Sequence, residues 1–431
     1  MFERLFVPGK LVEATSDAAW LAAMLEAERA LAAASARAGV IPAEAAEAIA
    51  TACRPERFDA ERLVAEGRAS GNPAEPLVRA LTDAVGGEAA AYVHRGATSQ
   101  DIVDTAAMLV TRRALQLLVG VLDGVADESA RLAETYRSTP MVGRTLLQRA
   151  VPTTFGLKAA GWLVAVRDAR TGLARVREER LAVQLGGAAG TLAAFRDSGL
   201  EVRHHFAEEL QLAEPVLAWH TDRGRIAALA GALTAAAATL AKIAVDVALL
   251  AQTEVAEVTD TEGGGSSTMP HKRNPVGTAL AVACARQVHG YTAVLTAPGG
   301  QEHERGLGGW HSEWHALSGA LAYTGGAADA VRRTVAGLDV DPGRMLENLK
   351  ASGGDLAAER VSLALAERVG RGAAHDVVAE AVTRARARES SLAEELAADE
   401  RVDLSREELE AALDPLTYLG HAETLVDAAL R

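Results

Sequence analysis

The chain has 431 residues, 49% of them hydrophobic, and carries a formal net charge of −14 at pH 7. This length suggests two or three domains, and the hydrophobic content is enough for a large core, which argues against a disordered chain. The acidic balance, without a cluster of lysine or arginine, argues against a nucleic-acid partner. Alanine, leucine, glutamate and arginine dominate, whereas aromatic residues make up 4%. This bias toward helix formers predicts an all-α protein.

The cysteines and the apolar segments of the sequence indicate in which cellular compartment the protein lies. Cys53 and Cys284 show no metal-binding or redox spacing, so we expect two structural thiols, a reducing compartment and no metal site. The N-terminus lacks the basic-then-apolar order of a signal sequence, and the longest apolar run, residues 226–251, contains Lys242 and Asp246. The sequence therefore predicts a cytoplasmic protein with no membrane partner.

The N-terminal part of the chain is predicted to be a small helical domain. Residues 17–54 predict two helices, the second of which opens at Pro42. A short irregular stretch is expected next. Residues 70–73 are expected to break the pattern before a further helix, which Gly86 and Gly87 end. We place the end of this domain at residue 104.

Three long apolar segments, at residues 102–136, 152–183 and 223–258, predict the long helices of a central bundle. The third is apolar on more than one face, so we expect other helices, including those of other subunits, to enclose it. In the first segment, apolar residues at alternating three and four spacing form one stripe: Leu115, Leu118, Leu122 and Val125.

The bundle domain is predicted to span residues 105–343 and to end in a loop at residues 337–344, which contain Asp341-Pro342-Gly343. The remaining residues, 344–431, predict a smaller C-terminal helical domain. The sequence shows no internal repeat.

Polar residues gather first at residues 92–101, where His94, Thr98 and Ser99 precede a long helix and Asp101 lies near its start. Hydroxyls and free backbone amides at a helix start form an anion site. Helix capping alone would also explain Ser99 and Asp101, and a lone histidine is more often structural.

Two further stretches are weaker signals. Residues 143–152 place Arg144 and Gln148 just before a helix whose first turn is expected to hold Pro152. Residues 301–310 place Arg305 beside glycines. For each stretch, an ordinary loop explains the residues as well as a ligand contact does.

Residues 263–275 carry the strongest signal. Three glycines and the tandem hydroxyls of Ser266 and Ser267 predict a lid that closes over a pocket. Lys272 and Asn274 behind them offer the charge and amide dipole that stabilise a growing carboxylate charge. A flexible linker would explain the glycines but not Lys272 and Asn274.

The motifs His-x-Gly-x-Thr-Ser-x-Asp at residues 94–101 and Gly-Arg-Thr-x-x-Gln-x-Ala at residues 143–150, followed by the serine loop, resemble the fumarase/aspartase superfamily over the whole chain. The resemblance implies the three-domain fold of that superfamily, and a homotetramer whose sites are each assembled from three subunits. It also implies a cofactor-free β-elimination through an enediolate-like intermediate. Ser266 would be the catalytic base, and Lys272 and Asn274 would stabilise the anion.

One departure from the superfamily pattern concerns Leu146. Many of the lyases carry a histidine there, which is associated with protonating the leaving group. Amines and alkoxides require that proton, whereas a carboxylate, with a reference pKa near ~4, leaves unassisted at neutral pH. We therefore expect a carboxylate to be the nucleophile or leaving group, as in the closing and opening of a lactone.

Within the superfamily the chain resembles the bacterial 3-carboxy-cis,cis-muconate cycloisomerases, through residues 184–191, 301–314 and 413–420. The resemblance implies lactonisation of this tricarboxylate to 4-carboxymuconolactone in the protocatechuate (β-ketoadipate) branch of aromatic catabolism. Arg95 and Gly224 depart from the expected tryptophan and aspartate. The residues expected to orient the substrate carboxylates are His94, which could also act as an acid, and Thr98, Ser99, Arg144, Gln148 and Arg305.

Three alternatives stay open. An adenylosuccinate lyase-like, amine-eliminating enzyme also carries the segment Met269–Pro275, although Leu146 argues against it. A non-catalytic homologue that keeps the fold for packing is opposed by the joint presence of Ser266, Lys272 and Asn274. A helical scaffold or binding protein does not account for a glycine loop between long helices.

Overall fold

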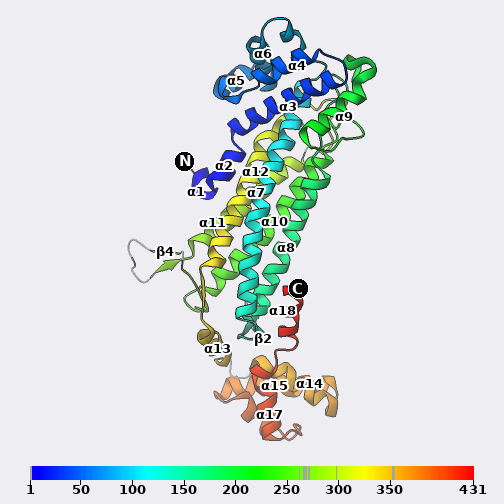
Figure 1. The fold of residues 1–431 in the computed structure, drawn as a ribbon. Coiled ribbons are helices and arrows are strands. Elements are labelled where there is room, and N and C mark those ends of the chain that lie inside the picture. Colours follow the sequence, from blue (N-terminus) through cyan, green and yellow to red (C-terminus); the bar gives the residue numbers. More distant parts are fainter. Residues whose placement is uncertain (1, 262, 266–268, 270–271, 298, 352–354) are drawn as a thin grey trace. The chain divides into compact units, whose positions relative to one another are not determined.

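The computed structural model describes residues 2–261, 263–265, 269, 272–297, 299–351 and 355–431 (Figure 1). Most of these residues are helical, and the strands among them form two-stranded sheets only, which confirms the predicted all-α class. Residue contacts divide the chain into two compact units, each assembled from three separate segments. The domain boundaries at residues 104 and 343 stay a prediction.

The first unit comprises Met1–Asp123, Arg167–Lys242 and Ala279–Val331. Apart from one long helix, α3 (Asp17–Arg37), the described elements of its N-terminal part are short. These elements are α1 (Glu3–Phe6), α2 (Gly9–Ala14), α3 (Asp17–Arg37), α4 (Ala43–Ala52), η1 (Pro55–Arg57), α5 (Ala60–Gly67), α6 (Ala74–Val85) and η2 (Glu88–Tyr92).

Capping residues explain where several of these helices begin. The Ser16 hydroxyl accepts a hydrogen bond from the amide of Ala19 at the start of α3, and Pro42 directly precedes α4, as predicted. The Asp59 carboxylate accepts hydrogen bonds from the first turn of α5. The short irregular stretch predicted after Arg54 corresponds to residues 54–59, which contain η1, and the further predicted helix corresponds to α6, which Gly86 ends.

Within the described part of the chain, five long helices form the bundle: α7 (Ser99–Thr135), α8 (Phe155–Glu179), α10 (Gly224–Leu250), α11 (Val276–Thr296) and α12 (Gly309–Ala336). The first three confirm the long helices predicted from the sequence. The predicted stripe on α7 is completely buried: Leu115, Leu118, Leu122 and Val125. Polar contacts join neighbouring helices, since Trp162 on α8 donates to Asp246 on α10 at 2.7 Å, and Thr234 on α10 contacts Thr292 on α11 at 2.9 Å.

Two of the described helices, α7 and α10, are long and apolar enough to span a membrane by length and composition. The core helix of a bundle meets the same criteria, and 67% of the most apolar window of α7 is buried. For α10 the buried share is 44%. Many large apolar residues of α10 are buried, including Leu233, Leu240 and Val247, but Val245 is 43% exposed. The open side of the helix therefore combines glycine and alanine with Val245 and Lys242. The predicted enclosure of this helix is therefore only partly supplied within one chain.

The second unit comprises Gly124–Val166, Ile243–Thr278 and Arg332–Arg431. It contains the antiparallel pairs β1 (Pro140–Thr145) with β2 (Gln148–Thr154), β3 (Val258–Asp260) with β6 (Leu338–Val340), and β4 (Gly264–Gly265) with β5 (Arg273–Asn274). Its other elements are α13 (Pro342–Lys350), η4 (Asp355–Ala357), α14 (Ala358–Val369), α15 (Arg371–Arg388), α16 (Leu392–Ala397), α17 (Arg406–Leu413), η5 (Pro415–Thr417) and α18 (Ala422–Leu430).

Two expectations for this unit are wrong. Pro152 lies in β2 and not in the first turn of a helix, because Val151, Thr153 and Thr154 favour an extended chain and α8 begins only at Phe155. Residues 337–344 are not a simple loop either. They contain β6 and the start of α13, where the Asp341 carboxylate accepts a hydrogen bond from the amide of Arg344 at 2.9 Å.

The C-terminal helices of the second unit enclose a small core of their own. Its buried members come from α14, α15, α16 and α17: Val361, Leu365, Ala374, Val377, Ala381, Leu392, Leu396 and Leu409. Both α16 and α17 begin with reciprocal capping boxes, formed by Ser391 with Glu394 and by Ser405 with Glu408. The C-terminal domain of residues 344–431 stays a prediction, because these helices belong to one unit with Gly124–Val166 and Ile243–Thr278.

Candidate active site

The predicted polar segment at residues 92–101 includes the loop between η2 and α7. His94 and Gly96 both have positive φ, 56° and 77°. A Cβ on Gly96 would lie 2.6 Å from the Phe195 ring, within η3 (Ala193–Ser198), so only glycine fits this close approach. Thr98 and Ser99 follow and lead into α7. The loop that carries these candidate residues is therefore held against buried aromatic surface.

Asp101 is the centre of this part of the site. Its completely buried carboxylate accepts hydrogen bonds from the amides of Thr98 at 3.0 Å, Gly186 at 3.1 Å and Gly187 at 2.9 Å. His220 Nε2 lies 2.6 Å from the same carboxylate. Four donors compensate the cost of burying this charge. Asp101 thus joins the start of α7 to the segment at residues 186–187, a role that exceeds simple helix capping.

His94 contacts a carboxylate that the sequence reasoning did not identify. Its Nδ1 lies 2.6 Å from Glu28 Oε1 on α3, and the Glu28 side chain is 1% exposed. Burial lowers the pKa of the imidazole, but the charges of Glu28 and Asp101 outweigh burial and raise this pKa above the ordinary histidine value. The pairing favours a protonated His94 with Nδ1–H directed at Glu28.

Arg305 joins the same cluster. It donates hydrogen bonds to the carbonyl oxygens of Gly187 at 2.5 Å and Ala188 at 3.1 Å, and to Gln100 Oε1 at 3.3 Å. The negative charge of Asp101 acts on both Arg305 and His94. The structure thus brings Arg305, from residues 301–310, to the segment at residues 92–101.

Behind this cluster lies a buried ionic network around Asp104. Its carboxylate accepts hydrogen bonds from Arg223 at 2.9 and 3.0 Å, Gln184 at 3.1 Å and Trp310 at 3.0 Å. Arg223 also donates to Glu313 at 3.0 and 2.5 Å. Burial opposes the charge on Arg223, but the two carboxylates raise the pKa of this guanidinium above its ordinary value.

The sequence contained a signal for this network that the motif analysis missed. Gln100, Asp101 and Asp104 interrupt the apolar pattern of α7, and Glu313 lies between Trp310 and Trp314. Polar groups on an otherwise apolar helix face require buried partners. Such partners come from distant segments, so their identity does not follow from spacing.

The predicted segment at residues 143–152 lies in the β1–β2 hairpin. Leu146 and Leu147 form its tip with positive φ, 50° and 64°, and are 96% and 72% exposed. Gln148 is exposed at the start of β2. Arg144 instead donates from both terminal nitrogens to the buried Glu257, at 2.9 and 2.7 Å. Because this carboxylate also accepts a hydrogen bond from Asn348 at 2.9 Å, Arg144 anchors the hairpin.

The glycine- and serine-containing stretch at residues 263–275 contains the β4–β5 hairpin. Gly264 pairs with Asn274 and Gly265 with Arg273, and Lys272 is exposed beside β5. A Cβ on Gly263 would lie 2.8 Å from the Asp260 carbonyl oxygen, and one on Gly264 would lie 2.8 Å from Val276. These glycines are therefore required for close packing in addition to any flexibility. Ser266, Ser267 and Thr268 lie outside the described residues.

The candidate residues thus fall into two sets. His94, Thr98, Ser99 and Arg305 belong to the first unit, and Arg144, Gln148, Lys272 and Asn274 belong to the second. Each set is held by its own contacts: the first by Asp101 and its neighbours, the second by the two hairpins. Within the second set, Arg144 and Gln148 lie on the β1–β2 hairpin, whereas Asn274 lies in β5 and Lys272 directly precedes that strand.

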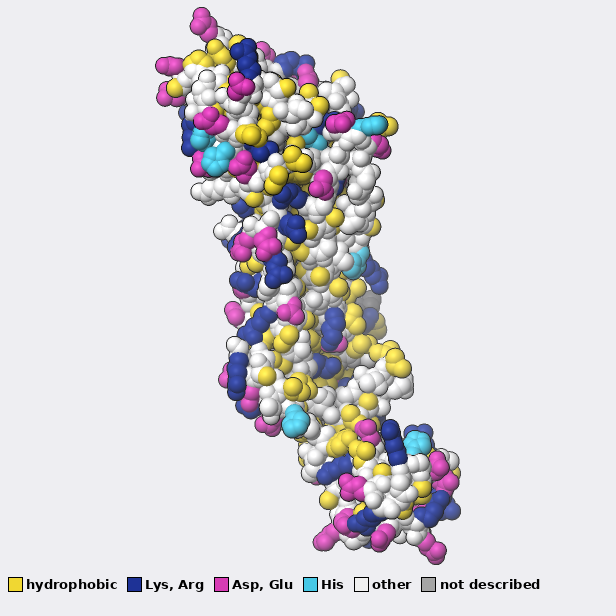
Figure 2. Space-filling view, turned by 90° about the vertical axis from the view of Figure 1, so that its right-hand side faces the viewer, with side chains coloured by type: hydrophobic (Ala, Val, Ile, Leu, Met, Phe, Trp, Pro, Cys, Tyr) yellow, Lys and Arg dark blue, Asp and Glu magenta, His cyan; other side chains and the backbone are white. Residues whose placement is uncertain are grey.

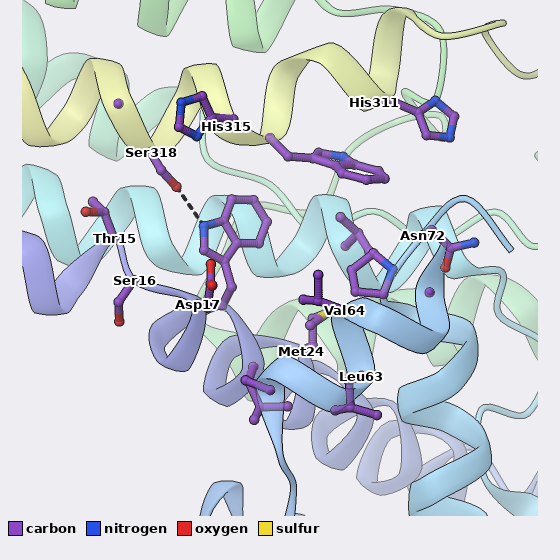
Figure 3. A pocket seen from close by; sticks show the side chains of 18 of the residues that line it. Thr15, Ser16, Asp17, Met24, Leu63, Val64, Asn72, His311, His315 and Ser318 are labelled. Atoms are coloured by element: carbon purple, nitrogen blue, oxygen red, sulfur yellow. Dashed lines mark hydrogen bonds between the residues drawn. The ribbon is translucent and has the colours of Figure 1, made fainter. Parts of the chain in front are cut away.

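A separate cavity of about 920 Å³ lies in the first unit. Helices α3, α5 and α12 line it, and Trp20 Nε1 donates to Ser318 Oγ at 2.8 Å across it (Figure 3). Figure 3 shows Met24, Leu63 and Val64 on one side and His315 on the other. The described candidate residues do not line this cavity, so it is not the site that the motifs predict.

Among the described residues, His204, His205 and Glu208 on α9 (Gly199–Leu210) have ligand atoms within 4.8 Å of one another and could hold a metal ion. They lie on the surface and already pair with Glu214 and Arg37. The two cysteines are poor ligands, because burial raises the pKa of both thiols to about 12.

Comparisons with known proteins agree with the motifs. A family model described as "Lyase" matches residues 8–290, and one described as "Adenylosuccinate lyase C-terminus" matches residues 354–429. The chain is 47% identical to a 3-carboxy-cis,cis-muconate cycloisomerase of Bradyrhizobium diazoefficiens, over 97% of this chain and 94% of that protein. It is 48% identical to a nitrosuccinate lyase of Streptomyces davaonensis, over 97% and 91% of the two chains.

A solved structure agrees as well. The crystal structure of 3-carboxy-cis,cis-muconate lactonizing enzyme from Pseudomonas putida superposes with a TM-score of 0.92 at 41% identity, covering 100% of this chain and 98% of that one. The family model covers more than half of the chain, and the relatives match it over nearly its whole length. The chain therefore belongs to the lyase family of the fumarase/aspartase superfamily.

Proposed function

We propose that the chain is a cycloisomerase that lactonises 3-carboxy-cis,cis-muconate to 4-carboxymuconolactone. The observation that carries this proposal is full-length similarity to cycloisomerases, at 47% identity in sequence and a TM-score of 0.92 in structure, combined with Leu146 in place of an acid. One substrate carboxylate oxygen attacks the ring-forming carbon, and the electrons of the double bond move onto a second carboxylate. A proton then adds to the adjacent carbon, so the reaction is an isomerisation without a leaving atom.

The tip of the β1–β2 hairpin carries no side chain that could protonate a leaving group. Leu146 has no proton to give, and its flanking residue Leu147 has none either. A carboxylate or another weakly basic anion needs no proton at neutral pH to depart. The local chemistry therefore fits carboxylate addition and elimination better than amine elimination.

In the proposed mechanism Ser266 delivers the proton, while Lys272 and Asn274 stabilise the enediolate-like intermediate. His94, Thr98, Ser99, Gln148 and Arg305 orient the three carboxylates. Arg144 is assigned a supporting role, because its terminal nitrogens are directed at Glu257 and hold the hairpin that carries Gln148. No cofactor is part of the proposal.

A second candidate is elimination of nitrite from nitrosuccinate. The 48% identity to a nitrosuccinate lyase favours it, and nitrite, like a carboxylate, departs as a weakly basic anion. Leu146 is therefore compatible with either reaction. The two candidates share the acidic carbon next to a carboxylate and differ in the group that leaves or adds.

We propose further that the chain assembles as a homotetramer with shared active sites and acts in the cytoplasm in aromatic catabolism. The partly open side of α10 supports self-association, because only 44% of the most apolar window of this helix is buried within one chain. Acidic and basic side chains are interspersed on the face shown in Figure 2.

The test is a steady-state absorbance assay with purified protein and 3-carboxy-cis,cis-muconate, followed by identification of the lactone. We expect the absorbance of the conjugated diene to fall and 4-carboxymuconolactone to accumulate. Turnover of nitrosuccinate to nitrite with no activity on the muconate would replace the first candidate with the second. Activity on adenylosuccinate alone would overturn both.

A further inference from the structure

The pair formed by Glu28 and His94 has the geometry of a carboxylate–histidine dyad. Glu28 lies in the middle of α3 and His94 lies 66 positions later, before α7. The 2.6 Å contact uses Nδ1 of the ring, and the ring is 17% exposed whereas Glu28 is 1% exposed. The buried end of the dyad is thus the carboxylate, and the imidazole is the end nearer to solvent.

Glu28 has few alternative partners. Its second oxygen, Oε2, is buried without a hydrogen bond to the described residues. A buried carboxylate that is only partly satisfied is costly, and it favours a positively charged neighbour. His94 is the neighbour to which it is bonded.

Of the other titratable groups around the dyad, Asp101 favours the imidazolium, whereas Cys53 carries no charge and Arg29 carries a positive one. Cys53, at the end of α4, lies within electrostatic reach of Glu28, and its thiol is neutral because burial raises its pKa to about 12. Arg29 is the next residue on α3 and acts on that thiol. Asp101, on α7, adds a second negative charge that acts on His94.

We infer that Glu28 is a positioning residue that holds His94 as an imidazolium, with Nε2–H available to bind one carboxylate of the substrate. Nδ1–H donates to Glu28, which sets the ring orientation and leaves Nε2 as the second donor. No described residue accepts a hydrogen bond from Nε2. The left-handed backbone of His94, with φ of 56°, fits a residue whose conformation is imposed by its surroundings.

In this assignment His94 binds an anion and transfers no proton. The identity of the ligand as a di- or tricarboxylate rests on the proposed function. The charge state of His94 rests on the geometry of the dyad. These two parts can be tested separately.

The first test is the variant Glu28→Gln, which keeps the acceptor oxygen for Nδ1–H and removes the charge. The pKa of His94 should fall, so KM for the carboxylate substrate should match that of the wild type at pH 6. At pH 8 it should be higher, by up to about tenfold for each pH unit by which this pKa falls, with kcat nearly constant. A purely structural role would change activity equally at both pH values.

The matched control is Glu26→Gln on the same helix, which removes an ion pair with Arg113 outside the dyad. This variant should leave the pH dependence of KM unchanged. A shift as large as that of Glu28→Gln would show that the effect is a general one of charge on α3 and would overturn the assignment.

The second test uses no substrate and stands even if Glu28→Gln fails to fold. The protein is labelled with ¹³C at histidine Cε1, and His94→Gln identifies the His94 resonance. We expect this imidazole to titrate above the ordinary histidine pKa of about 6.5. Titration below that value would overturn the inference whatever reaction the enzyme catalyses, whereas lack of turnover with the muconate and nitrosuccinate would overturn only the proposed function.

Discussion

His220 Nε2 lies 2.6 Å from the carboxylate of Asp101, and both side chains are buried. The same carboxylate holds the amides of Gly186 and Gly187. Because Arg305 in turn donates to the carbonyl oxygen of Gly187, the position of this candidate substrate-binding arginine depends on a carboxylate that it does not bond.

Replacing Asp101 by Asn should therefore reduce both stability and activity. The amide group presents an N–H₂ to a position where backbone amides already donate, so the free energy of unfolding should fall by about 2–4 kcal/mol. Chemical denaturation measures the change. Asp123→Asn, at the partly exposed pair with Arg170, is the control and should cost less than about 1 kcal/mol. Equal losses in the two variants would refute the central role of Asp101.

The variant Gly96→Ala tests the packing of the loop that carries His94. A methyl group at this position meets the Phe195 ring at 2.6 Å on a backbone with φ of 77°. We expect a loss of about 2 kcal/mol or more together with lower activity. Gly161→Ala on α8, where nothing lies within 4 Å of the added Cβ, should raise stability by up to about 1 kcal/mol. Wild-type activity in Gly96→Ala would contradict the close packing of this loop.

The hairpin tip should be strained as it stands. Leu146 and Leu147 both adopt positive φ, which a type I′ turn requires and which Asn and Gly adopt more readily. The double variant Leu146→Asn/Leu147→Gly should therefore raise the free energy of unfolding by about 1 kcal/mol, seen as a higher thermal midpoint. Leu363→Gly, at an exposed position within α14, should lower it by a similar amount. A lower midpoint for the hairpin variant would show that the leucines make stabilising contacts.

The Glu28–His94 dyad should make stability depend on pH. Because the folded-state pKa of His94 is raised, its contribution is fully present below the unfolded value of about 6.5 and is lost as pH rises through the folded value. The wild type should therefore lose stability relative to Glu28→Gln/His94→Gln between pH 6 and pH 9. The loss is about 1.4 kcal/mol for each unit by which the pKa is raised. A constant difference across this range would contradict the raised pKa.

Sequence reasoning succeeded where the signal is local. The stripe of Leu115, Leu118 and Leu122 reports helical periodicity, which depends only on neighbouring residues, and all three are buried as predicted. The position of Asp101 near the start of a helix was also predicted correctly, because it too depends on local sequence. Pro152 was misplaced because a proline suits both the first turn of a helix and a strand, and only the flanking β-branched residues distinguish the two.

The partners of the candidate site could not be predicted in the same way. Glu28 is separated from His94 by 66 positions, and Arg223 is separated from Asp104 by 119. Neither pair has a spacing that a motif records, because such contacts arise from the packing of helices distant in sequence. Arg144 shows the converse, since its motif predicted a ligand contact and the fold directs it to Glu257.

Proton delivery is assigned to Ser266, and the variant Ser266→Ala tests it. Turnover should fall by about a hundredfold or more, the loss typical of a removed proton donor, with little change in the free energy of unfolding. Ser267→Ala is the neighbouring control and should retain most of the activity. Wild-type turnover in Ser266→Ala would remove the role assigned to that hydroxyl.

The ratio of kcat/KM for 3-carboxy-cis,cis-muconate to that for nitrosuccinate, measured on one preparation, tests the central claim most directly. Both substrates carry the carboxylates that the candidate residues bind, so the ratio reports the reaction that the site stabilises. The proposed function predicts a ratio well above one, with 4-carboxymuconolactone as the product of the muconate. A ratio well below one, with nitrite as the main product, would contradict it.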